Sequence, residues 1–183
     1  MSKLVTDYIK VYREYTQDQL DLIVETSSDF NWSPHQWGSY KQIDGSRNEA
    51  ELDVSYAPNV ITQLVVEKSI TSCEKYILEF DNLFHINDIS PPRFNRYTEN
   101  TNMKNHIDHI HSLFDGKNKG IPVLSIVTVF NDDYSGGDFI FNDDYNVELS
   151  AGDTLIFPSV FLFKHKVNTV TQGVRLSAVS WTW

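Results

Sequence analysis

The clearest strand pattern in the chain is "KHKVNTVTQGVRLSAVSWTW", residues 164–183. Its last part is rich in β-branched and aromatic residues, as β-strands are. Period-two alternation places four side chains on one face of this final strand: Arg175, Ser177, Val179 and Trp181. An arginine that faces the inside of a barrel is costly unless it meets an anion. A guanidinium beside a hydroxyl suits a bidentate grip on a carboxylate, so Arg175 and Ser177 predict an anion site.

The same strand signature occurs upstream of residue 164. Gly, Asp and Asn turn signals separate the segments, which predicts successive antiparallel strands. The segments are "IPVLSIVTVF" (121–130), "GGDFIFND" (136–143) and "NVELSAGDTLIFPS" (146–159). The stretch "NDDYSGGD" resembles a calcium loop, but its twelfth position is Asn142 and not the glutamate of an EF-hand. We interpret its Asp and Gly residues as turn formers.

The first half of the chain has a helical pattern. Thr16 is a predicted N-cap for "QDQLDLIVETSSD" (17–29), with Leu20, Ile23 and Val24 on one face. "PNVITQLVVEKSITSCEKYILEFD" (58–81) suits one long helix or two short ones, with these apolar positions: Ile61, Leu64, Val65, Ile70, Ile77 and Leu78. Helices followed by a group of strands predict an α+β fold in which helices support a barrel or sandwich. We expect one domain over 1–183, helical to about residue 85.

Composition excludes several classes of protein. The 183 residues suit a single domain, and the single cysteine, Cys73, excludes an internal disulfide framework. A formal net charge of −10 without a basic cluster argues against nucleic-acid binding. The longest apolar runs are about half the ~20 residues of a membrane helix, and the N-terminus lacks a secretory pattern. We expect a soluble cytoplasmic protein, in the host cytoplasm if the Asn- and Ile-rich composition reflects a phage gene.

Half of the six histidines lie in "NHIDHIHSLF", residues 105–114. On a strand, alternation puts His106 and Asp108 on one face, and Ile107 and His109 on the other. A third ligand is needed, and His165 is the best candidate, 57 residues after Asp108 and at the start of a predicted penultimate strand. Two histidines and one carboxylate are the facial triad of non-haem Fe(II) oxygenases, which leaves three metal positions open.

Together, these segments resemble the prolyl 4-hydroxylase-like branch of the 2-oxoglutarate- and Fe(II)-dependent dioxygenases. The matching pieces occur in the family's order from about Phe94 to the C-terminus: "FNRYTENTNMKNHIDHI", "VLSIVTVFNDDYSGGDFIF", "LSAGDTLIFPS" and "KHKVNTVTQGVRLSAVSWTW". The resemblance implies a double-stranded β-helix core, of the jelly-roll or cupin-like type, over about 86–183. Asn105 departs from the family pattern, as do Lys164 and Lys166 beside His165; alternation points both lysines away from the metal.

The resemblance also implies the roles of the site residues. His106, Asp108 and His165 would bind Fe(II) and act in catalysis; Arg175, helped by Ser177, would hold the distal carboxylate of 2-oxoglutarate. Tyr97, in the family's "RY" strand, would also contact this co-substrate. The implied reaction consumes O2, releases succinate and CO2, and hydroxylates an unactivated C–H bond of a prolyl, other peptidyl or small-molecule substrate. Ascorbate is a further candidate cofactor. Retention of Asp108 argues against halogenation.

Each of these residues also has a simpler structural explanation. Alone, His106 and Asp108 suit a surface turn or a hydrogen bond, and Arg175 suits a structural ion pair. Tyr97 and Ser177 suit core packing, as Trp32 and Trp37 do in place of a substrate-covering loop. His109 and His111 are expected at the surface or behind the ligands, and Cys73 in the core. No zinc spacing is present.

The same residues are compatible with two other functions. A non-catalytic metal-binding β-helix that senses or binds partners is the alternative to an enzyme. A nucleic-acid demethylase is disfavoured, because Trp181 stands where that branch typically has its second arginine. The sequence identifies neither the substrate nor the oligomeric state.

Overall fold

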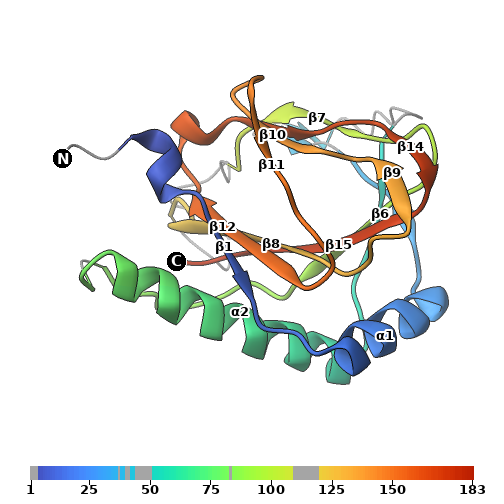
Figure 1. The fold of residues 1–183 in the computed structure, drawn as a ribbon, viewed down its shortest axis with the longest axis horizontal. Helices are drawn as coiled ribbons and strands as arrows, with labels where there is room; N and C mark the ends of the chain where they lie inside the picture. The colour runs from blue at the N-terminus through green and yellow to red at the C-terminus, as the bar shows by residue number, and fades with distance from the viewer. Residues whose placement is uncertain (1–3, 37, 40–41, 44–50, 83, 109–119) are drawn as a thin grey trace.

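The computed structural model describes residues 4–36, 38–39, 42–43, 51–82, 84–108 and 120–183, with backbone alone at 38–39 and 42–43. It contains two α-helices, α1 (Gln17–Thr26) and α2 (Asn59–Glu79). Both lie on one side of a strand assembly (Figure 1). Three short 3-10 helices join the other elements: η1 (Val5–Tyr8), η2 (Ser27–Asp29) and η3 (Phe161–Phe163). No helix in the described ranges is long and apolar enough to cross a membrane.

The larger sheet has seven antiparallel strands in the order β1-β12-β8-β15-β6-β5-β2. Its long central strands pair in a continuous register, with Arg175 opposite Tyr97 and Ser177 opposite both Asn95 and Val129. The strand bounds are β1 (Lys10–Arg13), β2 (Ser33–Pro34), β5 (Asp53–Ser55), β6 (Arg93–Tyr97), β8 (Leu124–Val129), β12 (Asp153–Pro158) and β15 (Arg175–Trp181).

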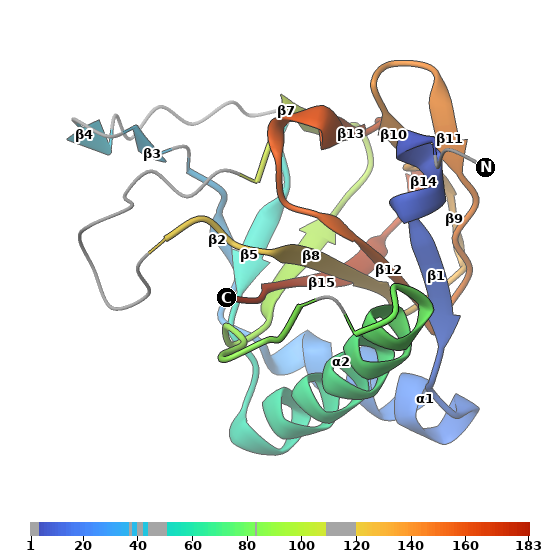
Figure 2. The ribbon, with the colours of Figure 1, turned by 90° about the vertical axis from the view of Figure 1, so that its left-hand side faces the viewer.

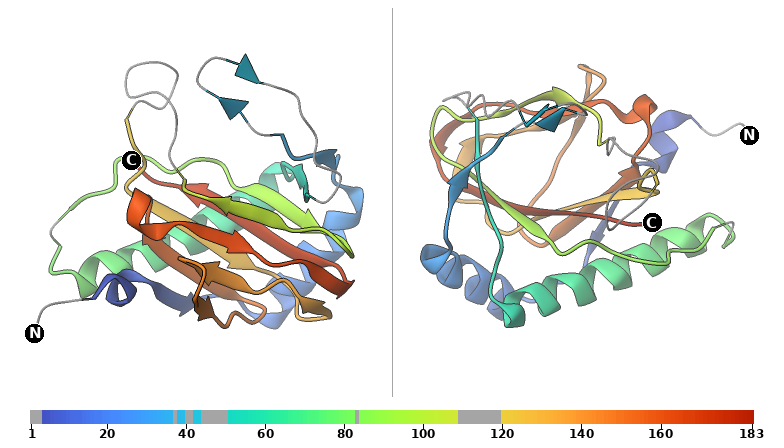
Figure 3. Two further views of the ribbon diagram at one scale, coloured as in Figure 1. Left: turned by 90° about the horizontal axis from the view of Figure 1, so that it is seen from above. Right: turned by 180° about the vertical axis from the view of Figure 1, so that it is seen from behind.

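The smaller sheet has four strands in the order β11-β10-β13-β7 and faces the larger one. The two sheets enclose a barrel, with the helices outside it (Figure 3). Two further antiparallel pairs are β14 with β9 and β3 with β4. The α+β fold with a double-stranded β-helix core is therefore confirmed. The remaining bounds are β3 (Gly38–Ser39), β4 (Gln42–Ile43), β7 (Met103–His106), β9 (Tyr134–Gly136), β10 (Phe139–Phe141), β11 (Tyr145–Val147), β13 (His165–Val167) and β14 (Val170–Gly173).

The apolar core lies on both sides of the larger sheet. Between the sheets, Phe157 packs with Phe139 and Phe141, and Leu155 is fully buried. Outside the larger sheet, the two helices cover its other face (Figure 2). Every residue of β8 is buried as a result, which is the pattern of a strand covered on both faces.

The helix predictions are largely confirmed. Thr16 caps α1 with a capping box to Gln19, and α1 buries Leu20 and Ile23. Val24 was wrongly placed on that face; it is 38% exposed, because α1 contacts the core through a narrow stripe. The segment 58–81 forms one long helix.

The buried face of α2 is not purely apolar. It combines apolar and small polar residues: Ile61, Val65, Ser69, Ser72, Cys73 and Tyr76. Two of the apolar positions of this helix, Ile70 and Leu78, are exposed, and Cys73 and Tyr76 pack on the larger sheet with Ile156 of β12.

Three other predictions need correction. The first half is not simply helical, because β1, β2 and β5 join the larger sheet. His165 begins the third strand from the end, since β13 and β14 are separate strands on either side of residues 168–169. The predicted turn "NDDYSGGD" contains strand β9.

Candidate functional site

The three predicted metal ligands lie together inside the barrel. Strands β7 and β13 are antiparallel neighbours with His106 opposite His165, and Asp108 follows the end of β7 by two residues. Asp108 Oδ1 lies 3.4 Å from His106 Nε2 and 3.8 Å from His165 Nε2. One candidate ligand atom from each residue lies within 4.8 Å of the other two. This separation suits a single ion bound by all three side chains.

The backbone orients both imidazoles in the same way. His106 Nδ1 lies 2.8 Å from the carbonyl oxygen of Lys104, and His165 Nδ1 lies 2.9 Å from that of Phe163. A carbonyl oxygen only accepts, so each Nδ1 carries the hydrogen and donates it. Each Nε2 therefore keeps a lone pair directed toward Asp108, which is the tautomer that metal-bound histidines need.

The charge state of the cluster also fits a cation. Burial lowers the pKa of His165, against the opposing attraction of the Asp108 carboxylate, and so favours the neutral imidazole that binds a metal. Burial raises the pKa of Asp108, but the neighbouring imidazoles of His165 and His106 outweigh it and hold that pKa below its usual range. Asp108 Oδ2 is buried and accepts no hydrogen bond from the described residues. Buried polar atoms normally have a partner, and a metal ion is the partner that would suit this carboxylate oxygen.

Arg175 is the first residue of β15 in the larger sheet, which faces the sheet of the two histidines. It is 1% exposed, and its Nη1 donates to Ser177 Oγ at 3.0 Å. Its guanidinium carbon lies 5.2 Å from the centre of the Tyr97 ring. No carboxylate in the described ranges forms an ion pair with Arg175, and its Nε has no acceptor there. The structural ion pair considered for Arg175 is therefore missing from this part of the chain.

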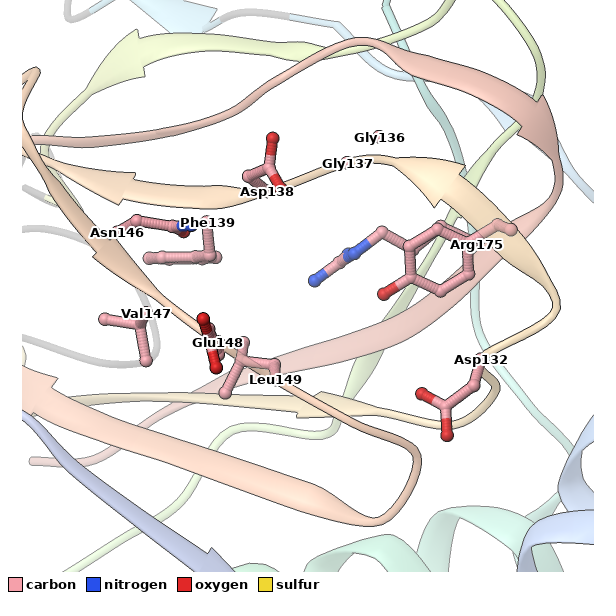
Figure 4. A pocket seen from close by; sticks show the side chains of 11 residues that line it. Asp132, Gly136, Gly137, Asp138, Phe139, Asn146, Val147, Glu148, Leu149 and Arg175 are labelled. Atoms are coloured by element: carbon pink, nitrogen blue, oxygen red, sulfur yellow. The ribbon is translucent and has the colours of Figure 1, made fainter.

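Gly137 makes room for Arg175. Figure 4 looks into a hollow of about 240 Å³ into which the Arg175 guanidinium points, with Phe139 and Glu148 among the lining residues. A Cβ on Gly137 would come within 2.9 Å of Arg175 Cδ, and its φ of +71° is one that other residues rarely adopt. Arg175 also lines the pocket of the metal cluster, so it lies between the two spaces.

Three residues with hydrogen-bonding side chains line the metal pocket but were not singled out as site residues from the sequence. Arg93 and Asn95 share the inner face of β6 with Tyr97, and Trp181 lines the pocket from β15. The alternation in "RFNRY" places Arg93 and Asn95 on the face of Tyr97, so that signal was present.

The remaining candidates lie elsewhere. Trp32 packs on Phe30 and under the Arg96 guanidinium, 5.7 and 4.7 Å away, which confirms packing. Lys164 and Lys166 point away from the cluster, as predicted, and pair with Asp143. Trp37, His109 and His111 lie outside the described residues. Cys73 is buried, as expected.

Residues 92–183 match the model of the 2OG-Fe(II) oxygenase superfamily. A PKHD-type hydroxylase of Delftia acidovorans is 40% identical over 102 residues, which are 51% of this chain and 43% of that protein. The PKHD-type hydroxylase PiuC of Pseudomonas aeruginosa is 37% identical over 100 residues, with the same two coverages. The matched region thus spans less than half the length of these curated relatives.

Solved structures share the fold at low sequence identity. A viral collagen prolyl hydroxylase from Paramecium bursaria Chlorella virus-1 matches with a TM-score of 0.66 at 11% identity, over 96% of this chain and 94% of that one. A Pseudomonas putida prolyl-4-hydroxylase matches with 0.64 at 18% identity, over 97% and 96%. A Trichoplax adhaerens prolyl hydroxylase, in complex with a hypoxia inducible factor peptide fragment, matches with 0.69 at 14%, over 97% and 84%. These likenesses support the fold alone.

Proposed function

The chain belongs to the 2OG-Fe(II) oxygenase superfamily, and we propose that it is a hydroxylase acting on an unactivated C–H bond of a prolyl or other peptidyl substrate. The observation that carries the proposal is the cluster of His106, Asp108 and His165, which faces Arg175 across the barrel, a buried arginine with no anionic partner among the described residues. We further propose that residues 1–183 act as one domain, since the described helices and both sheets share continuous cores.

His106 Nε2, His165 Nε2 and the Asp108 carboxylate would hold Fe(II). Two imidazoles and one carboxylate are the donor set that this ion takes in oxygenases. With Fe(II) and 2-oxoglutarate bound, the centre supplies the O2 chemistry that yields succinate, CO2 and a hydroxylated product. The protein's part is orientation: the two Nδ1 hydrogen bonds keep both rings turned toward Asp108, and burial keeps water from competing.

Arg175 would bind the distal carboxylate of 2-oxoglutarate. Ser177 accepts a hydrogen bond from Nη1 and so positions the guanidinium, leaving Nε without an acceptor in the described part of the chain. Burial raises the pKa of Tyr97, which keeps its phenol protonated and able to donate to the same carboxylate. Ascorbate, if it acts, would serve to keep the iron reduced.

A peptidyl substrate is supported by the solved relatives. One structural neighbour is named a collagen prolyl hydroxylase, and another is a prolyl hydroxylase in complex with a peptide fragment. A small-molecule substrate uses the same site, so the first experiment tests the site and not the substrate.

The test is anaerobic titration of the protein with Fe(II) and then 2-oxoglutarate, followed by visible spectroscopy. We expect a saturable charge-transfer band in the wild type that is lost in Asp108→Ala. Arg175→Ala should weaken 2-oxoglutarate binding roughly 10- to 100-fold, the usual effect of losing a charge-assisted hydrogen bond. Arg96→Gln is the matched control, since Arg96 is on β6 but pairs with Asp53 outside the barrel. A wild type without the band, although loaded with iron, would contradict the proposal. A band without turnover on any substrate would favour the non-catalytic alternative.

A further inference from the structure

The metal pocket contains a second arginine, at the opposite end of β6 from Arg175. In the register of β6 and β15, Arg175 stands opposite Tyr97, whereas Arg93 stands opposite Val179. Strands rise about 3.3 Å per residue, so about 13 Å of strand separates these two positions. Arg93 lines the same pocket as His106 and Asp108. The pocket thus has one guanidinium at each end.

Within the described ranges, the side chains that Arg93 hydrogen-bonds or stacks on are neutral, and the Asp108 carboxylate attracts it only from beyond ion-pairing distance. Its Nε donates to Asn95 Oδ1 at 3.3 Å, and its guanidinium carbon lies 5.5 Å from the centre of the Trp181 ring. No carboxylate of the described residues forms an ion pair with it within 4.0 Å. Its two terminal nitrogens make no hydrogen bond in that part of the chain. A partly buried guanidinium with unused donors is costly unless an anion is supplied from outside.

Trp181 provides a second unused donor beside Arg93. Its indole Nε1–H is buried and has no acceptor among the described residues. Because a buried donor without an acceptor is rare in a folded protein, this nitrogen also indicates a missing ligand. The unused donors of Arg93 and Trp181 at this end of the pocket match a carboxylate, which only accepts.

Arg96, on the same strand as Arg93, is an arginine whose charge is paired within the protein. Its side chain points outward, where Nη2 lies 2.8 Å from Asp53 Oδ2 and the guanidinium stacks on Trp32. Arg93 has the aromatic partner but lacks the carboxylate. The difference between these two residues of β6 therefore indicates that the anion for Arg93 comes from a ligand.

We propose that Arg93 and Trp181 bind a carboxylate of the primary substrate, so that the hydroxylated molecule is an acid. This inference rests on the proposed function, with Arg175 reserved for 2-oxoglutarate. The carboxylate is either the α-carboxylate of a free amino acid or an acidic group of a peptide next to the reacting residue. Both sources present the same planar pair of oxygens to the guanidinium.

The test compares acids with their neutral counterparts. Fe(II)-loaded protein with 2-oxoglutarate is assayed for stimulated CO2 release by the twenty L-amino acids against their amides. A second arm uses capped proline peptides with aspartate or glutamate on either side of proline, against asparagine and glutamine counterparts. We expect kcat/KM for the acid to exceed that of its neutral partner by roughly tenfold or more. The arm in which stimulation occurs identifies the source of the carboxylate.

Variants assign the preference to Arg93. In Arg93→Gln the acid-to-neutral ratio should fall to near one through a higher KM, and Arg93→Lys should recover part of it. Arg96→Gln should keep the wild-type ratio. A wild-type ratio near one, a ratio unchanged in both Arg93 variants, or a panel in which no acid stimulates turnover would overturn the carboxylate site. The charge-transfer band is recorded in parallel: if the wild type has the band and any of these results is found, only the carboxylate site fails, whereas absence of the band removes both proposals.

Discussion

The two sheets of the barrel are built differently, although both face the metal pocket. The larger sheet is covered on both faces, and β8 is buried along its whole length. Neither α1 nor α2 lies over the outer face of the smaller sheet, and β10 and β13 alternate between buried and partly exposed residues. The two arginines of the metal pocket, Arg93 and Arg175, lie on the larger sheet, whereas His106 and His165 lie on the smaller one. The pocket arginines thus lie on the sheet that is covered on both faces. The two histidines lie on the sheet with the more exposed outer face, where hydrogen bonds to nearby carbonyl oxygens orient their rings.

The largest effect is expected for Phe157→Ala, which removes a fully buried ring from the larger sheet. Phe157 contacts the rings of Phe139, Phe141 and His165 across the barrel. The loss of transfer energy and the cavity should cost about 3–5 kcal/mol of unfolding free energy, measured by urea denaturation. The control is Tyr145→Ala on the smaller sheet, where the side chain is 40% exposed and the expected change is within about 0.5 kcal/mol. Equal losses at the two positions would refute the contrast between the sheets.

A second test uses pH on the helix-covered side of the larger sheet. Burial raises the pKa of the Cys73 thiol to about 12 and also raises the pKa values of Tyr15 and Tyr76. In the unfolded chain these groups ionise near their ordinary values, about 8.5 for cysteine and 10 for tyrosine. Below those values the contribution to stability is complete, and it is lost as pH rises toward the folded pKa.

We therefore expect the urea midpoint to fall steadily as pH rises above about 9. Cys73→Ala should reduce this slope, and the native thiol should react with a disulfide reagent at pH 8 far more slowly than the thiol in urea. A flat stability profile from pH 8 to pH 11 would be inconsistent with this burial.

The smallest effect is expected on the open face of the smaller sheet. Lys164 Nζ lies 2.9 Å from Asp143 Oδ2, and both side chains are about half exposed. Exposed ion pairs contribute little, so Lys164→Gln should leave the thermal midpoint and the 2-oxoglutarate titration unchanged within error. A clear loss of iron binding in Lys164→Gln would show that the outer face supports His165 after all.

Local patterns predicted most of the β-helix and the site. The strands between residues 124 and 181 are rich in β-branched and aromatic residues and are separated by turn signals, and the H-x-D spacing with His165 locates the cluster. Strands β1 and β5 were not predicted, because four- and three-residue strands have too little periodicity and their pairing partners lie far along the chain. The buried stripe of α2 was missed where Ser69 and Ser72 replace apolar residues.

The site was predicted less completely than the fold. Arg175 was recognised because it follows His165 by ten residues and shares an inward face of the last predicted strand with the hydroxyl of Ser177. Arg93 alternates in the same way, but alternation alone does not say which face of β6 is inside the barrel. Only the pairing of β6 with β15 decides that orientation. The role of Gly137 also required the structure, because its close approach to Arg175 joins segments 38 residues apart.

The pairing register of β6 and β15 limits which mutations in β6 the pocket can tolerate during evolution. Arg93, Asn95 and Tyr97 reach the pocket only because they occupy alternate positions of one strand. Gain or loss of a single codon within that strand would exchange its two faces, placing Phe94 and Arg96 inside and the three pocket residues outside. Substrate preference can therefore diversify by replacing side chains one at a time, whereas the spacing of β6 is inherited as a unit.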